Sequence, residues 1–280
     1  LHLLSRRQRQ MCIRDRLNVL FCLLKCLSGM DFINKLAVKY RSNPVAKILF
    51  APLWHLYMPY NLKKRNRFFR LYGMELLSKV KKVLDSEDCF FWLDFGTLLG
   101  AYREHAFLQH DLDIDCAAFV DIAERLPSIL EKEGIKLLYE YRVEGNKNGV
   151  EQTYVYKSVT IDFFFYEAIG NDLMRCHSFA SYGAKTVNNI EKVSVKQIVV
   201  PNKGFTKIYF NGEYFNIPAY TEEYLGMHYG VNFMFPNKHF DYKKEATNIK
   251  YFSIEEMIGY RRNYISCLLY TSPSPRDRSV

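Results

Sequence analysis

Glycine and proline are scarce in this chain, whose 280 residues include 14 glycines and 9 prolines. This scarcity excludes a collagen-like or low-complexity protein. With 49% hydrophobic and 25% charged residues, the chain has enough apolar side chains to bury a core, which argues against disorder along its whole length. The length suits one large domain or two small ones.

Paired cysteines, long apolar runs and internal repeats are lacking as well. No two of the 7 cysteines have the CxxC spacing of a zinc module, and Cys22 and Cys26 share a helical face that is expected to pack in a core. The apolar run 17–27 is shorter than the roughly 20 residues that a membrane span needs. The longer uncharged run 48–62 is interrupted as an apolar segment by Pro52, His55 and Pro59.

The two ends of the chain read as foreign sequence. Residues 6–16, RRQRQMCIRDR, and residues 267–277, CLLYTSPSPRD, match translations of a common transposase-based sequencing adapter. We therefore expect segments 1–16 and 267–280 to be adapter-derived and to take no part in the fold. They hold 7 arginines and 2 aspartates, so more than half of the net charge of +9 comes from them, and a nucleic-acid partner is not expected. Five cysteines remain, an odd number that argues against a disulfide framework.

The rest of the chain is expected to form an N-terminal helical arm, 17–67, and a domain, 68–266. Aromatic residues surround a basic cluster at the end of the arm, which consists of Lys63, Lys64, Arg65, Arg67 and Arg70. Such a mixture can make peripheral contact with an anionic membrane surface. We favour the alternative, an arm packed on the domain with a solvated basic face.

Hydrophobic periodicity predicts an α/β or α+β domain. Helices are expected at 68–86, 96–103, 122–133 and 221–229, the last capped by Thr221. Strands are expected at 90–95, 113–119, 137–143, 152–156, 159–166, 173–179, 206–210 and 214–217, with turns at 146–149 and Asn211-Gly212.

Three aspartates, Asp111, Asp113 and Asp115, alternate along an extended segment that leads into the predicted strand 113–119. The period of two places their side chains on one face, where like charges repel each other. A cation would resolve this conflict, and Mg²⁺ prefers oxygen ligands and retains substrate phosphates in its coordination shell. The alternative is a solvated acidic loop without function.

The segment before these acids has the features of a phosphate-binding turn. Gly96 and Thr97 follow a strand and begin a helix, where backbone amides and the helix dipole favour an anion. Arg103, two turns further on, can neutralise phosphate charge. A phosphate cradle followed by paired carboxylates is typical of metal-assisted phosphoryl chemistry.

A further acid, Asp162, stands in the almost wholly apolar strand 159–167. A buried carboxylate needs a partner, and a metal or the proton of an attacking hydroxyl would supply one. A backbone amide is the structural alternative.

The strings GTLLGAYRE (96–104), HDLDID (110–115) and IDFFFY (161–166) resemble the LicD/fukutin family, as does IPAYTEEYLGMHYG (217–230) followed by Phe235-Pro236. The resemblance covers roughly 68–242. It implies a nucleotidyltransferase-like mixed sheet flanked by helices, and transfer of a phospho-alcohol from a CDP-linked donor to a glycan or glycolipid. Bacterial members use CDP-choline, and fukutin-like members use CDP-ribitol. His110-Asp111-Leu112 stands where many phosphocholine enzymes carry a Trp and continuous acids, which leaves the alcohol open.

Carried over by position, the resemblance implies particular roles for seven residues. Asp113 and Asp115 match the pair that binds Mg²⁺ or Mn²⁺, and Asp162 matches the third acid of the catalytic and metal-binding set. The phosphate motif and the positions typical of the family are matched by Gly96, Thr97, Arg103 and Asp111.

Three other functions share parts of this pattern. A glycosyltransferase can bind the metal of a nucleotide sugar through a DxD element, although no nucleotide-binding βα unit is recognisable before Asp113. A nucleotidyltransferase would attach the nucleoside monophosphate itself. A glycan- or membrane-binding module with a dead site is the non-enzyme alternative, and the intact acids argue against it.

Deletion of residues 1–16 and 267–280 is expected to leave stability and activity unchanged, because both ends match the adapter. The melting temperatures of the trimmed and complete proteins test this. A fall of several degrees on trimming would show that the ends are part of the folded structure.

Overall fold

The computed structural model describes residues 44–182, 184, 186–237 and 240–264, with side chains from Pro59 onward. Both expected adapter segments, the first part of the arm, and Cys22 and Cys26 lie outside the described residues. Within them no helix is long and apolar enough to cross a membrane. Cys89, Cys116 and Cys176 are buried and carry free thiols.

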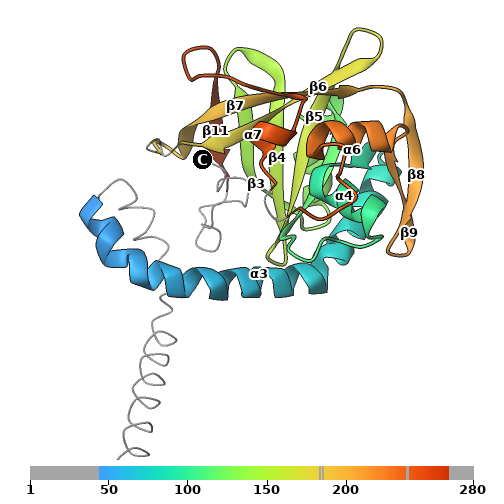
Figure 1. Cartoon of the computed structure of the whole chain (residues 1–280). Helices are drawn as coiled ribbons and strands as arrows, with labels where there is room; N and C mark the ends of the chain where they lie inside the picture. Colours follow the sequence, from blue (N-terminus) through green and yellow to red (C-terminus); the bar gives the residue numbers. More distant parts are fainter. Residues whose placement is uncertain (1–43, 183, 185, 238–239, 265–280) are drawn as a thin grey trace, which may run out of the picture. The chain divides into compact units, whose positions relative to one another are not determined.

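The described chain alternates a few helices with many strands (Figure 1). The helices are α3 (Pro44–Ser86), α4 (Phe95–Arg103), the 3₁₀ turn η1 (Val120–Ile122), α5 (Leu126–Glu131), α6 (Thr221–Tyr229) and α7 (Tyr242–Glu245). The strands are β1 (Phe91–Leu93), β2 (Asp113–Phe119), β3 (Lys136–Val143), β4 (Asn146–Tyr156), β5 (Val159–Ile169), β6 (Leu173–Ser181), β7 (Ile190–Pro201), β8 (Phe205–Phe210), β9 (Glu213–Pro218), β10 (Ile249–Tyr251) and β11 (Ile258–Asn263).

A nine-stranded mixed sheet organises the domain, which confirms the expected fold class. Its strands follow the order β1-β2-β5-β4-β3-β11-β7-β10, and β6 pairs with both β5 and β7. The strands β5, β4, β3, β11, β7 and β6 therefore close a ring, and β2 extends it as the parallel neighbour of β5. The hairpin of β8 and β9 forms a separate two-stranded sheet, joined by Asn211 and Gly212 with positive φ of 48° and 100°.

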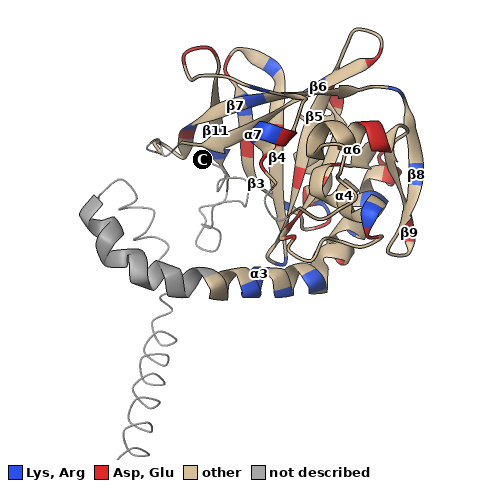
Figure 2. Cartoon of the chain, viewed as in Figure 1, with Lys and Arg blue, Asp and Glu red and all other residues tan. Residues whose placement is uncertain are grey.

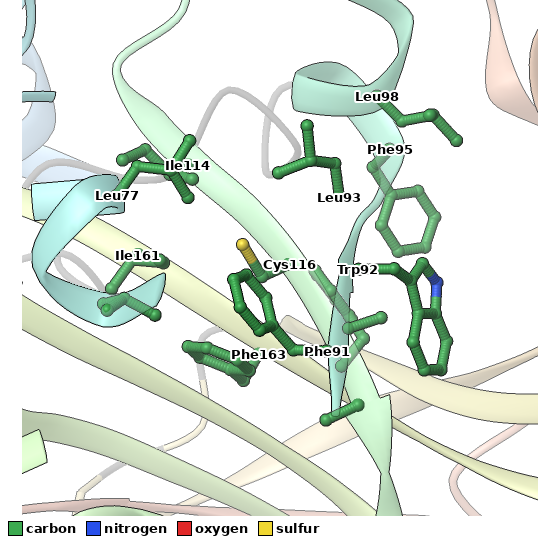
Figure 3. Close-up of a cluster of buried hydrophobic side chains, with 14 of the residues drawn as sticks. Leu77, Phe91, Trp92, Leu93, Phe95, Leu98, Ile114, Cys116, Ile161 and Phe163 are labelled. Atoms are coloured by element: carbon green, nitrogen blue, oxygen red, sulfur yellow. The ribbon is translucent and has the colours of Figure 1, made fainter. Parts of the chain in front are cut away.

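The core lies between α3 and one face of the sheet. Leu77 of α3 lies against Ile114 and Ile161, and Phe91 lies near Phe163 (Figure 3). The expected helix 68–86 is confirmed, because Phe69, Leu76, Val80 and Leu84 are buried at helical spacing. This segment is helical because its apolar side chains form one stripe, and that stripe packs in the core against the sheet.

The helix extends further toward the N-terminus than expected, since α3 runs continuously from Pro44 through Pro52 and Pro59. Four members of the basic cluster, Lys63, Lys64, Arg67 and Arg70, are exposed on this helix (Figure 2). Their exposure agrees with a solvated basic face.

Three local expectations are corrected by the structure. The turn expected at 146–149 lies earlier, at Glu144-Gly145, because Gly145 adopts φ of 70° and β4 already begins at Asn146. The helix expected at 122–133 is divided into η1 and α5, with a proline at the start of α5. Thr221 is the first residue of α6 rather than its cap, and its hydroxyl donates to the Pro218 carbonyl at 2.6 Å.

His177 of β6 is buried, and neither of its ring nitrogens has a hydrogen-bond partner among the described residues. Burial, together with the charge of Arg175, lowers the pKa of His177 to about 4 from its ordinary 6.5. Between these two values the unfolded chain binds more protons than the folded chain at this site. The free energy of unfolding should therefore rise with pH across this window.

The replacement His177→Leu should flatten that rise by up to about 1.4 kcal/mol per pH unit, because one titrating group is removed. Urea unfolding at several pH values between 4 and 7 measures the slope. An unchanged slope in the variant would contradict the inferred burial of a neutral histidine.

Candidate functional site

A reciprocal pair of hydrogen bonds joins the start of α4 to β2. The Gly96 amide donates to Asp115 Oδ2 at 3.0 Å, and the Asp115 amide donates to Thr97 Oγ1 at 2.9 Å. Thr97 and Asp115 are both buried. The predicted phosphate motif is thus hydrogen-bonded to Asp115, one member of the predicted metal pair. In this structure the Gly96 amide donates to a carboxylate.

A second carboxylate approaches the same glycine. A Cβ added at Gly96 would lie 3.1 Å from Asp115 Oδ2, a tight contact, and 3.7 Å from Asp111 Oδ1, an ordinary van der Waals contact, so both acids lie beside this glycine. Asp111 is itself fixed by the Leu108 amide, which donates to its Oδ2 at 2.9 Å. Burial raises the pKa of Asp111 to about 8, and the charges of Asp115 and Asp113 add to this rise.

The remaining predicted acids lie on the adjoining strands. Asp113 and Asp115 are two residues apart on β2 and therefore share a face. The parallel pairing of β2 with β5 places Asp162 directly beside Asp115, and Thr160 beside Asp113. Asp162 is 9% exposed. It lies beside Asp115 at the beginning of β2, and Asp111 and Asp115 both lie beside Gly96.

These oxygen ligands fit Mg²⁺ in kind, and the mutual repulsion that raises the pKa of Asp111 is one that a cation would relieve. Among the described residues, no group of three or more His, Cys, Asp or Glu side chains is placed so that it could hold a metal ion by itself. Mg²⁺ commonly binds through one or two carboxylates together with substrate phosphates. The arrangement therefore fits a metal that is held jointly with its substrate.

Arg103 is placed away from the acids, at the opposite end of α4. Its Nη1 donates to the Phe233 carbonyl at 3.0 Å, and its Nη2 pairs with Glu104 at 2.7 Å. The seven residues from Gly96 to Arg103 correspond to about 10 Å along a helix. In this structure Arg103 ties α4 to the segment after α6.

A buried polar cluster around Asp94 was missed by the sequence predictions. Asp94 is fully buried, caps α4 by accepting from the Phe95 amide at 2.8 Å, and accepts from the Tyr166 and Tyr224 hydroxyls at 2.8 and 2.9 Å. Burial raises its pKa to about 7, although these hydrogen bonds oppose the rise. The sequence signal that was available is a carboxylate within an apolar stretch, the same feature that singled out Asp162.

The first residue of α4 is held in an uncommon conformation. Phe95 has φ of 40°, in the left-handed region that bulky residues rarely adopt. Its ring packs against Phe164 at 4.5 Å and His228 at 4.8 Å between centroids. The aromatic contacts and the Asp94 cap together aim the N-terminus of α4 at Asp115.

Comparisons with known proteins agree with this geometry. A family model described as LicD/FKTN/FKRP, nucleotidyltransferase domain, matches residues 88–219. Residues 88–219 thus match the nucleotidyltransferase domain of the LicD/fukutin family. The match contains α4, β2 and β5, and therefore every predicted site residue.

Curated relatives include proteins named ribitol-5-phosphate transferase FKTN from Macaca fascicularis, Mus musculus and Homo sapiens. Each is 25% identical to this chain over 185 residues, which cover 65% of the chain. The matched part spans 37% of the relatives' own length.

Replacement of Asp94 by Ala should lower the free energy of unfolding by about 2–4 kcal/mol, because the Phe95 amide and two tyrosine hydroxyls lose a buried acceptor. Asp94→Asn should cost less, since one oxygen acceptor remains. Denaturant unfolding measures both. The matched control is Asp85→Ala at the exposed end of α3, expected within about 0.5 kcal/mol; equal losses in the Asp94 and Asp85 alanine variants would contradict a capping role.

Proposed function

We propose that this protein is a metal-dependent phosphotransferase that moves a phospho-alcohol from a CDP-linked donor to a hydroxyl of a glycan or glycolipid. The supporting observation is the junction of Gly96, Thr97 and Asp115, because it joins a helix N-terminus to clustered acids. A diphosphate needs a site where backbone donors and a cation act on neighbouring oxygens. The family match and the names of the relatives support the same class of reaction.

Asp113 and Asp115 would hold the metal, Mg²⁺ or Mn²⁺, together with the donor's diphosphate, and Asp162 would complete the site or act as the base. When bound, the metal neutralises phosphate charge. The backbone at the start of α4 orients the diphosphate, and Thr97 and Asp111 keep Asp115 and the Gly96 turn in place. Arg103 supports the site by fixing α4 to the Phe233 segment.

The proposed reaction is an in-line displacement at phosphorus. The acceptor hydroxyl oxygen forms a bond to the phosphorus that carries the alcohol, and its proton passes to Asp162. The bond between this phosphorus and the bridging oxygen breaks, and CMP leaves with that oxygen. The products are the phospho-alcohol ester of the acceptor and CMP.

The acidic pair also suits a glycosyltransferase, because such enzymes bind a nucleotide-sugar metal through two aspartates. The transferred mass separates the two: a phospho-alcohol in one case and a sugar in the other. Metal-dependent release of nucleotide from a UDP- or GDP-sugar alone would establish the glycosyltransferase.

Asp113→Asn and Asp115→Asn should each reduce turnover by at least about a hundredfold, the scale of losing a main electrostatic stabiliser. Thr97→Ala should cost about tenfold, because neighbouring backbone amides remain. The assay is CMP release from CDP-ribitol and CDP-choline with Mg²⁺, with and without a glycan acceptor. Asp121→Asn, at an exposed position on η1, is the matched control. Undiminished CMP release in EDTA, or by both asparagine variants, would sink the metal mechanism.

A further inference from the structure

Helix α6 lies next to α4 (Figure 1) and bonds to it near both of its ends. At the beginning of α4, the Tyr224 hydroxyl donates to Asp94 Oδ1 at 2.9 Å. At the other end, the Tyr102 hydroxyl donates to Glu222 Oε1 at 3.0 Å. The first of these contacts lies at the end of α4 that adjoins the acids, and the second lies away from them.

The Tyr224 hydroxyl binds the particular oxygen that caps α4. Asp94 Oδ1 also accepts from the Phe95 amide at 2.8 Å, whereas the Tyr166 hydroxyl donates to the other oxygen, Oδ2. Asp94 and both tyrosines are buried, so these bonds are shielded from solvent. Tyr224 therefore holds the same carboxylate oxygen that holds the Phe95 amide.

Phe95 needs this support because of its backbone conformation. Its φ of 40° lies in the left-handed region, which is unfavourable for any residue with a Cβ. The contacts of its ring with Phe164 and His228 oppose that cost together with the cap. The next amide along the chain belongs to Gly96 and donates to Asp115 Oδ2 at 3.0 Å. A change of Phe95 to a negative φ would redirect the Gly96 amide and break this bond.

We propose that Tyr224 is a positioning residue of the proposed phosphotransferase site. Through Asp94 it keeps Phe95 in the left-handed conformation. The Gly96 amide then holds the Asp115 carboxylate in place for the metal. The inference rests on the proposed function, in which Asp115 binds Mg²⁺ together with the donor's diphosphate, and it adds a residue that touches neither of them.

A positioning role predicts a loss of affinity that depends on the metal. Tyr224→Phe removes the hydroxyl and keeps the ring, and titration calorimetry of CDP into the complete protein measures the affinity with Mg²⁺ and with EDTA. With Mg²⁺ the variant should bind CDP about fivefold more weakly than the wild type, the scale of one hydrogen bond. In EDTA the two proteins should bind CDP alike, because Asp115 then holds no metal. In the CMP-release assay, KM for Mg²⁺ should rise while kcat at saturating Mg²⁺ is unchanged.

Tyr102→Phe is the matched control. It also removes a tyrosine hydroxyl that joins α4 to α6, but at the end of α4 away from the acids. Its affinity for CDP with Mg²⁺ should equal that of the wild type. An equal loss in the Tyr102 and Tyr224 variants would show that the two helices matter only as packing, and would overturn the proposal.

A second substitution separates positioning from stability. Glycine adopts positive φ without strain, so Phe95→Gly makes the conformation of the turn independent of the cap. In the Tyr224→Phe background it should restore the affinity for CDP with Mg²⁺ to within about twofold of the wild type. The melting temperature should fall further at the same time, because the Phe95 ring is lost from the core. A purely structural defect would lower both quantities together.

If Tyr224→Phe does not fold, two single variants take its place. Phe95→Ala and Phe95→Gly both remove the ring, but only alanine keeps a Cβ that strains the turn. Phe95→Ala should therefore bind CDP with Mg²⁺ more weakly than Phe95→Gly. Equal affinities of these two variants would overturn the proposal.

Three further results would contradict the role of Tyr224: an unchanged affinity in Tyr224→Phe, an equal loss with Mg²⁺ and with EDTA, or no recovery on adding Phe95→Gly. Failure of the proposed function looks different, since the Mg²⁺-dependent loss and its recovery persist but no CDP-alcohol releases CMP. If the wild-type protein binds no CDP, hydrogen exchange of the Gly96 amide gives the same test. Tyr224→Phe should accelerate this exchange and Phe95→Gly should restore the protection, and an unchanged exchange rate would overturn the proposal.

Discussion

The site depends on one contact between backbone and carboxylate, the exchange of hydrogen bonds between Asp115 and the Gly96-Thr97 turn. It fixes the position of α4 relative to β2, and the parallel pairing of β2 with β5 then fixes Asp162. A carboxylate that accepts from a backbone amide is stabilised in its charged form. The Gly96 amide therefore gives the buried Asp115 carboxylate a hydrogen-bond donor in place of water.

The carboxylates at this junction lie close enough to repel one another. Burial and two neighbouring carboxylates raise the pKa of Asp111. Asp94, two residues before Gly96, is fully buried. The two differ in how they are satisfied. Tyrosine hydroxyls and an amide surround Asp94, which makes it a structural cap, whereas the Asp111 carboxylate accepts from the Leu108 amide and lies near two other carboxylates. A cation bound with a diphosphate is the chemistry that the second arrangement suits.

The elements next to the site were predictable because their signals are local. Strand β2 and helices α4 and α6 agree closely with the expected segments, since apolar residues and turn residues mark their ends. Strands β7 and β11 were missed, because lysines, arginines and a glutamate interrupt their apolar residues. The orientation of Arg103 was not predictable either: helical spacing places it two turns from Gly96, but its contact with Phe233 depends on tertiary packing.

Long-range packing explains why part of the site escapes any local pattern. Tyr224 follows Asp94 by 130 residues, and only the packing of α6 against α4 brings its hydroxyl to the Asp94 carboxylate. The family match ends at residue 219, so the residues proposed for phosphoryl chemistry lie inside it and Tyr224 lies outside.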